Sequence, residues 1–158
     1  MKKIAAAIVA LGLIGTVSAQ QLKPEDMIKY RQSGYTFMAW NMGKIKAQVE
    51  GPADKFDKTQ VANAAKAIQG VANSGMGALY SAETKTGSGW KETRVLPEFF
   101  DPKNKDELTK IATNFNQQAN KLADVAAGGD QKAIAAQFGE LGKACKACHD
   151  KFRRDEKK

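Results

Sequence analysis

The sequence is poor in side chains that bind metals or form cross-links. Its 158 residues include one histidine and two cysteines, and all three lie in the segment CKACH at residues 145–149. A structural zinc site takes four ligands, so three Cys and His residues are too few. Two cysteines in an oxidising compartment could form a disulfide, but a spacing of three followed directly by histidine calls for another explanation.

The sequence also lacks internal repeats, low-complexity segments and any sustained alternation of polar and apolar residues. Alternation is typical of a half-buried strand, whereas the apolar residues here recur at steps of three and four, which indicates helices. We therefore expect an all-α fold, an antiparallel four-helix bundle. A thioredoxin-like dithiol is disfavoured, because that site belongs to a βαβ unit.

The formal net charge is +8, and much of the excess lies in the C-terminal tail. The one aromatic residue among these basic residues, Phe152, is predicted to face inward, so a solvated helix end is favoured over a nucleic-acid surface.

The N-terminus has the order of a bacterial secretory signal peptide: Met1-Lys2-Lys3, an apolar run over 4–14, then Val17-Ser18-Ala19. The apolar run is too short to cross a bilayer of about 30 Å as a helix. We expect residues 1–19 to be removed and residues 20–158 to form one domain in the periplasm, with no membrane span.

Four helices are predicted in residues 20–158. The first runs from Pro24 to the Gly51-Pro52 break, the second over 57–73, the third from near Asn104 to Gly128-Gly129, and the fourth follows the N-cap Asp130. The connection over 75–102 is expected to cover one end of the core with Trp90, Leu96, Phe99 and Phe100. The inward-facing residues are predicted to be Ile28, Arg31, Tyr35, Met38, Met42, Ile45 and Val49 on the first helix, Val61, Ala65, Ile68 and Ala72 on the second, Leu108, Ile111, Phe115, Leu122 and Val125 on the third, and Ile134, Phe138, Leu141, Cys145, Cys148 and Phe152 on the fourth.

Cys145, Cys148 and His149 form the motif CxxCH on the fourth helix. Residues three and four apart share a helix face, so two thiols could bond the vinyl groups of a haem while the imidazole binds its iron. The motif predicts one covalently attached haem c per chain.

The residue opposite His149 decides what such an iron can do. A second histidine is absent, which excludes a bis-histidine electron carrier. Methionines at helical spacing pack into cores more often than they bind metals, and Tyr35 could cover the distal face without binding iron. The methionines that remain after loss of the signal peptide are Met27, Met38, Met42 and Met76.

The segments LKPEDMIKYRQS and FGELGKACKACHDKFRR, with helices of suitable length between them, resemble the cytochrome c′ family, class II c-type cytochromes with a four-helix bundle. The resemblance implies that Cys145 and Cys148 hold the haem and that His149 is the proximal iron ligand beside Arg153. It also implies that Arg31 lies near the haem edge, where it could offset a propionate, and that Tyr35 covers the open sixth position.

The resemblance further implies a five-coordinate iron that binds nitric oxide or carbon monoxide, and a homodimer formed through the first two helices. The redox partner is unknown, and no general base or second redox centre points to an enzyme. The alternative is a low-spin electron carrier with Met27, Met38 or Met42 as sixth ligand. Relatives of that kind place the methionine near Arg31, and arginine cannot bind iron in its place.

Overall fold

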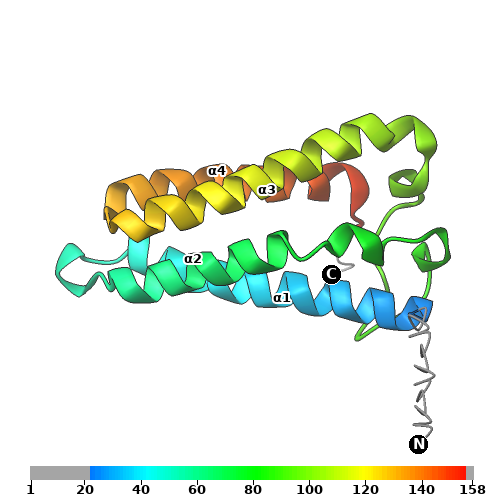
Figure 1. Ribbon diagram of the computed structural model, residues 1–158. Coiled ribbons are helices and arrows are strands. Elements are labelled where there is room, and N and C mark those ends of the chain that lie inside the picture. Colours follow the sequence, from blue (N-terminus) through cyan, green and yellow to red (C-terminus); the bar gives the residue numbers. More distant parts are fainter. Residues whose placement is uncertain (1–21, 156–158) are drawn as a thin grey trace, which may run out of the picture.

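The computed structural model describes residues 22–155, and the predicted signal peptide lies outside them. Four helices make up the body of the domain: α1 (Pro24–Val49), α2 (Lys58–Ala72), α3 (Lys105–Gly128) and α4 (Gln131–Phe152). They form the expected antiparallel bundle, with the longest connection between α2 and α3 (Figure 1). Among the described residues, no helix is both long and apolar enough to cross a membrane.

The helix ends follow from local chemistry. Pro24 begins α1, with Glu25 and Asp26 in the first turn, where acids suit the helix dipole. The side chain of Asp130 accepts a hydrogen bond of 2.8 Å from the backbone nitrogen of Ala133, so the predicted N-cap of α4 is confirmed. Gly129 ends α3 with a φ of 75°, a left-handed conformation that glycine adopts without strain.

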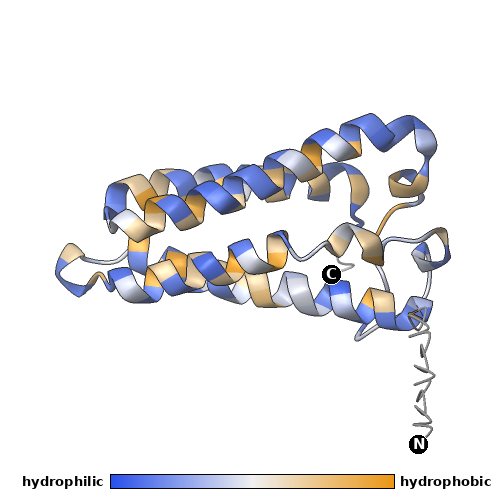
Figure 2. Cartoon of the chain, in the orientation of Figure 1, coloured by the Kyte–Doolittle hydropathy of each residue, from blue (hydrophilic) through white to orange (hydrophobic). Residues whose placement is uncertain are grey.

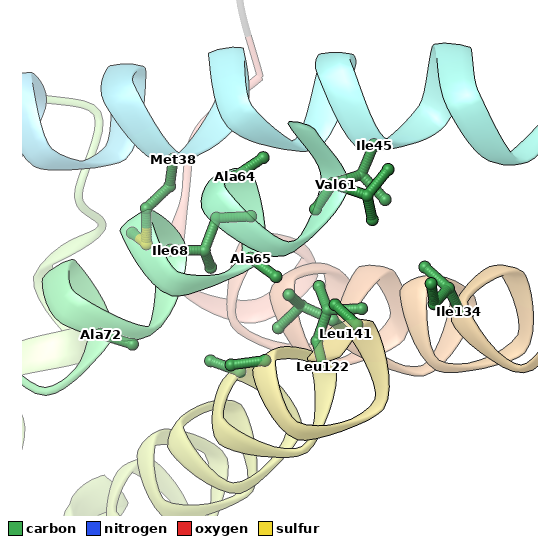
Figure 3. Close-up of a cluster of buried hydrophobic side chains, with 13 residues drawn as sticks. Met38, Ile45, Val61, Ala64, Ala65, Ile68, Ala72, Leu122, Ile134 and Leu141 are labelled. Carbon is green, nitrogen blue, oxygen red and sulfur yellow. The ribbon is translucent and has the colours of Figure 1, made fainter. Parts of the chain in front are cut away.

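The core is built from short and branched aliphatic side chains of all four helices (Figure 3). Figure 2 shows both hydrophobic and hydrophilic residues on each helix. The buried residues of each helix recur at helical spacing, so each helix turns one, mostly apolar, side inward. All four predicted inner residues of α2 are buried. Small side chains on α2 let its neighbours pack closely, and the largest fully buried apolar residues of the core are Ile28, Ile45, Val61, Ile68, Leu122, Ile134 and Leu141.

The connection between α2 and α3 folds back over α1 through four short 3-10 turns, Met76–Leu79, Ala82–Thr84, Pro97–Phe100 and Pro102–Asn104. Gly89 lies directly on α1: a Cβ at this position would come within 2.5 Å of the backbone nitrogen of Lys29. The connection also pairs with the end of α4, because the backbone nitrogen of Leu96 donates to the carbonyl of Phe152 at 2.9 Å. The segment therefore ties the first helix to the last.

The four residues of this connection that were predicted to cover one end of the core differ in outcome: the prediction is wrong for Trp90 and confirmed in part for the other three. Trp90 is 69% exposed and lies on the outer side of α1, where its Nε1 donates to Oγ of Ser33 at 2.7 Å. Leu96, Phe99 and Phe100 are half-buried. Among them, Phe99 reaches the core end, with its ring centroid 5.9 Å from that of Phe152.

Candidate haem site

Helix α4 carries both cysteines and the histidine in its last turns. Cys145 packs against the core, and Cys145, Cys148 and His149 are all partly buried. Both thiols are free. Burial is the main cause that raises the pKa of each thiol, while Arg153 slightly opposes the effect at Cys148. The thiols are therefore protonated at neutral pH, unlike the low-pKa thiolate of a disulfide oxidoreductase.

His149 lies in surroundings that keep its ring neutral. Burial lowers the pKa of His149 most, and the positive charges of Arg153 and Arg94 lower it further. Nη1 of Arg153 is 3.3 Å from Nε2 of His149. A guanidinium only donates, so Nε2 is the ring nitrogen that accepts and carries the lone pair. A neutral imidazole is the form that binds a metal, and Nε2 could bind iron only if its contact with Arg153 gave way.

Arg153 follows α4 in an extended conformation, and its backbone nitrogen donates to the carbonyl of His149 at 3.3 Å. Its Nε is a buried donor with no hydrogen-bond partner among the described residues. A buried donor of this kind is costly to leave unpaired, so the proximal side of the site retains a position for an acceptor. The structure brings Arg153 beside His149; its role toward a haem remains a prediction.

Two phenols face the cysteines from other elements. Tyr35 lies on α1, and its hydroxyl accepts a hydrogen bond of 3.1 Å from the hydroxyl of Tyr80. Burial is the main cause that raises the pKa of each tyrosine, and the thiol of Cys148 adds a smaller effect at both. Tyr35 is 41% exposed as a whole residue.

Arg31 is the charged residue predicted on the inner side of α1, and it is only 3% exposed. Its Nη1 donates to the carbonyl of Leu79 at 3.0 Å and to Oγ1 of Thr84 at 2.7 Å. Its Nη2 donates to the carbonyl of Thr84 at 3.1 Å and to Oγ1 of Thr93 at 2.7 Å. The guanidinium also lies 4.5 Å from the ring centroid of Tyr80. Arg31 thus fixes the connection to α1, and its predicted contact with a propionate stays a prediction.

Sequence reasoning missed Tyr80, Thr84 and Thr93. They lie in a segment of short turns without helical period, so no spacing pattern marked them as inward-facing. The charge of Arg31 on an otherwise apolar stripe was the available signal that polar residues from another segment lie next to it, because a buried guanidinium requires several acceptors.

The methionines are engaged in core packing or in a side-chain contact. Met38 is part of the buried core, and Met42 and Met76 pack against it. Met27 accepts a long contact of 3.8 Å from Oγ of Ser81. Core packing, the role expected at helical spacing, accounts for three of the four.

These residues fit a covalently attached haem better than a bare metal ion. Two protonated thiols one turn apart can form thioethers, and a neutral imidazole on the same face can bind iron. Within residues 22–155, no group of three or more His, Cys, Asp or Glu side chains is placed to hold a metal ion directly.

Comparison with known proteins agrees with this chemistry. A cytochrome c′ from Allochromatium vinosum is 50% identical over 149 residues, which is 94% of each chain. One from Rhodocyclus tenuis is 48% identical over 134 residues, 85% of this chain and 98% of its own.

Solved structures share the fold. A cytochrome c′ described as having an unusual ligand-controlled dimer dissociation is 50% identical, with a TM-score of 0.79 over 85% of this chain and 99% of its own. Two variants of the Alcaligenes xylosoxidans cytochrome c′, one with carbon monoxide bound and one in complex with nitric oxide, are 30% identical, with a TM-score of 0.72 over 84% of this chain and 98% of theirs. The family model described as cytochrome c′ matches residues 26–153. The chain therefore belongs to the cytochrome c′ family, whose members carry a covalently bound haem c in a four-helix bundle.

Proposed function

We propose that this protein is a periplasmic mono-haem cytochrome that binds nitric oxide or carbon monoxide, undergoes one-electron redox change and is not an enzyme. When bound, the haem supplies a five-coordinate iron with one open position for a diatomic gas. The observation that carries the proposal is the pair of neutral phenols, Tyr35 and Tyr80, beside the cysteines, while Met38, Met42 and Met76 pack in the core.

Each side chain of the cluster has a role in this proposal. Cys145 and Cys148 hold the haem through thioethers, and His149 binds the iron on the proximal side. After burial, the positive charge of Arg153 helps to keep the imidazole neutral by lowering the pKa of His149, and its 3.3 Å contact with Nε2 would give way to iron. Tyr35 covers the distal side, where a bulky, neutral side chain excludes anions, because their burial in an apolar site is costly.

Substitution of the distal side chain tests the gas-binding role. We expect Tyr35→Ala to bind carbon monoxide faster than the parent, because the cover is removed while the proximal side is unchanged. Met38→Ala and Met42→Ala should keep the high-spin spectrum of the parent. An unchanged association rate in Tyr35→Ala would refute steric control. Loss of a low-spin spectrum in a methionine variant would establish the alternative, an electron carrier with His and Met ligands.

Homodimer formation is part of the proposal. The outer face of α1 carries two exposed aromatic residues, Phe37 at 46% and Trp40 at 59% exposure. With Trp90 they line an open hollow of about 680 Å³. Exposed apolar surface of this kind marks interaction sites, and a relative in the family is described as a dimer. We expect Trp40→Lys to shift the protein toward monomers in sedimentation velocity, with Lys46→Glu as a control on the same helix.

Export is tested on the mature protein. We expect the purified chain to begin at Gln20 and to fractionate with the periplasm. An intact N-terminus at Met1 in the haem-loaded protein would contradict this part of the proposal.

A further inference from the structure

We propose that Tyr80 controls gas entry by holding Tyr35 in place through their hydroxyl–hydroxyl bond. This inference rests on the proposed gas-binding function and adds a residue, outside the sequence motif, that sets its rate. We call the two residues the phenol pair. Tyr80 donates and Tyr35 accepts at an oxygen–oxygen distance of 3.1 Å.

Two contacts hold the ring of Tyr80. Its ring stacks on Phe99, with centroids 4.5 Å apart and planes inclined by 27°. The guanidinium of Arg31 lies 4.5 Å from its ring centroid. Such contacts favour one ring position, because stacking and cation–π attraction both depend on geometry.

Arg31 is itself held by four hydrogen bonds to the connection, two of them to Thr84. Thr84 is fully buried, and its own hydroxyl donates to the carbonyl of Ser81 at 2.9 Å. The position of Tyr80 is therefore set by a network that includes α1, the turn at Ala82–Thr84 and Thr93, and Tyr80 cannot easily follow a displaced partner.

Tyr35 has more freedom. It lies on α1 and is 41% exposed, and its hydroxyl faces the fixed hydroxyl of Tyr80. If the side chain of Tyr35 must move for a diatomic gas to enter, the phenol pair must separate, and the lost hydrogen bond adds to the barrier.

Removal of one hydroxyl at a time isolates the bond from the steric cover, because phenylalanine keeps the ring. The experiment compares the parent with Tyr80→Phe, Tyr35→Phe and the double variant, each as fully haem-loaded protein. Carbon monoxide association to the ferrous form is followed by stopped-flow absorbance. Tyr30→Phe, a change at a half-exposed tyrosine of α1, is the control.

We expect each single variant to bind carbon monoxide about 2- to 10-fold faster, as loss of one neutral hydrogen bond predicts. The double variant should be no faster than the faster single variant, because both changes remove the same bond. Association rates in both single variants equal to that of the parent, or rate increases that multiply in the double variant, would overturn the inference.

A second readout does not depend on gas binding. In thermal unfolding of the ferric protein, each single variant should lower the midpoint, and the double variant should lower it by less than the sum. Additive shifts would refute the phenol pair. A parent that fails to bind carbon monoxide refutes the proposed function and, with it, control of gas entry. A parent that binds while the variants match its rate refutes only the control by Tyr80.

Discussion

Replacement of Arg31 by methionine should destabilise the protein strongly, although the change puts an apolar side chain on an apolar stripe. Arg31 is 3% exposed and donates four hydrogen bonds, all to neutral oxygens. Hydrogen bonds to a charged group contribute about 1.5–3 kcal/mol each, so the four amount to roughly 6–12 kcal/mol before the cost of burying the guanidinium is subtracted. That cost is several kcal/mol.

The difference predicts a net loss of about 2–4 kcal/mol in the free energy of unfolding. For a domain of this size, 1 kcal/mol corresponds to about 3–4 °C in the thermal midpoint, so the midpoint should fall by roughly 6–16 °C. Part of the loss comes from the carbonyls of Leu79 and Thr84, which methionine leaves without this donor.

The assay is thermal unfolding of the ferric protein by far-ultraviolet circular dichroism, with haem content and the spin state of the parent matched by absorbance, because a methionine at this position that bound iron would mask the loss. Lys46→Met is the control on the same helix, because Lys46 is 60% exposed and its nitrogen lies 3.9 Å from the Glu50 carboxylate. We expect the control to change stability by less than about 0.5 kcal/mol. A loss below about 1 kcal/mol in Arg31→Met would show that its hydrogen bonds merely offset its burial, and would refute the reasoning.

Three further predictions concern the packing of the connection, the buried phenols and the attachment of the haem. Gly89→Ala should lower the free energy of unfolding by about 1–3 kcal/mol, because the new Cβ would meet the backbone of α1 at Lys29. Gly139→Ala in α4, where a Cβ meets nothing within 4 Å, should instead raise it by up to about 1 kcal/mol. Changes of the same sign for both variants in urea denaturation would contradict this packing. Burial raises the pKa of Tyr35 and Tyr80 in the folded state, so above pH of about 10 the folded protein binds more protons than the unfolded chain. The contribution of the two phenols to the free energy of unfolding is therefore fully present below that pH and is lost as the pH rises further. The thermal midpoint should therefore fall more steeply above pH of about 10 in the parent than in the double phenylalanine variant, and equal slopes would argue against buried phenols. Cys145→Ala combined with Cys148→Ala should release haem into acidified acetone, which should not extract it from the parent; extraction from both would exclude thioether attachment.

The helix boundaries could be predicted because they depend on neighbouring residues. Asp130, Gly129 and Pro24 fix helix ends by local hydrogen bonds and backbone conformation, which the sequence displays directly. The inner face of α2 was equally accessible, since a helical period identifies buried positions without knowledge of the partner.

Contacts between distant segments could not be predicted in the same way. Arg31 meets Thr84 and Thr93, which are 53 and 62 residues away along the chain. Trp90 was expected to help cover one end of the core, yet its indole nitrogen donates to Ser33 and Lys29 lies 4.3 Å from its ring centroid. An aromatic ring with a polar edge gains from such a surface position, so hydrophobicity alone misplaced it.

The cysteines and histidine of the motif were recognisable because their spacing carries their chemistry. The partner of Tyr35 was harder to predict, because the two tyrosines meet only when the connection between α2 and α3 is folded against α1. Tyr80 comes from a segment that has no period and lies 45 residues further along the chain.

The most direct test of the account is the absorption spectrum of the purified haem protein when oxidised, when reduced, and when reduced under carbon monoxide. The account predicts high-spin bands in both oxidation states and a ready shift of the Soret band with carbon monoxide, because Tyr35 covers the distal side without binding iron. Sharp low-spin bands that do not respond to carbon monoxide would show a sixth protein ligand and would contradict the account.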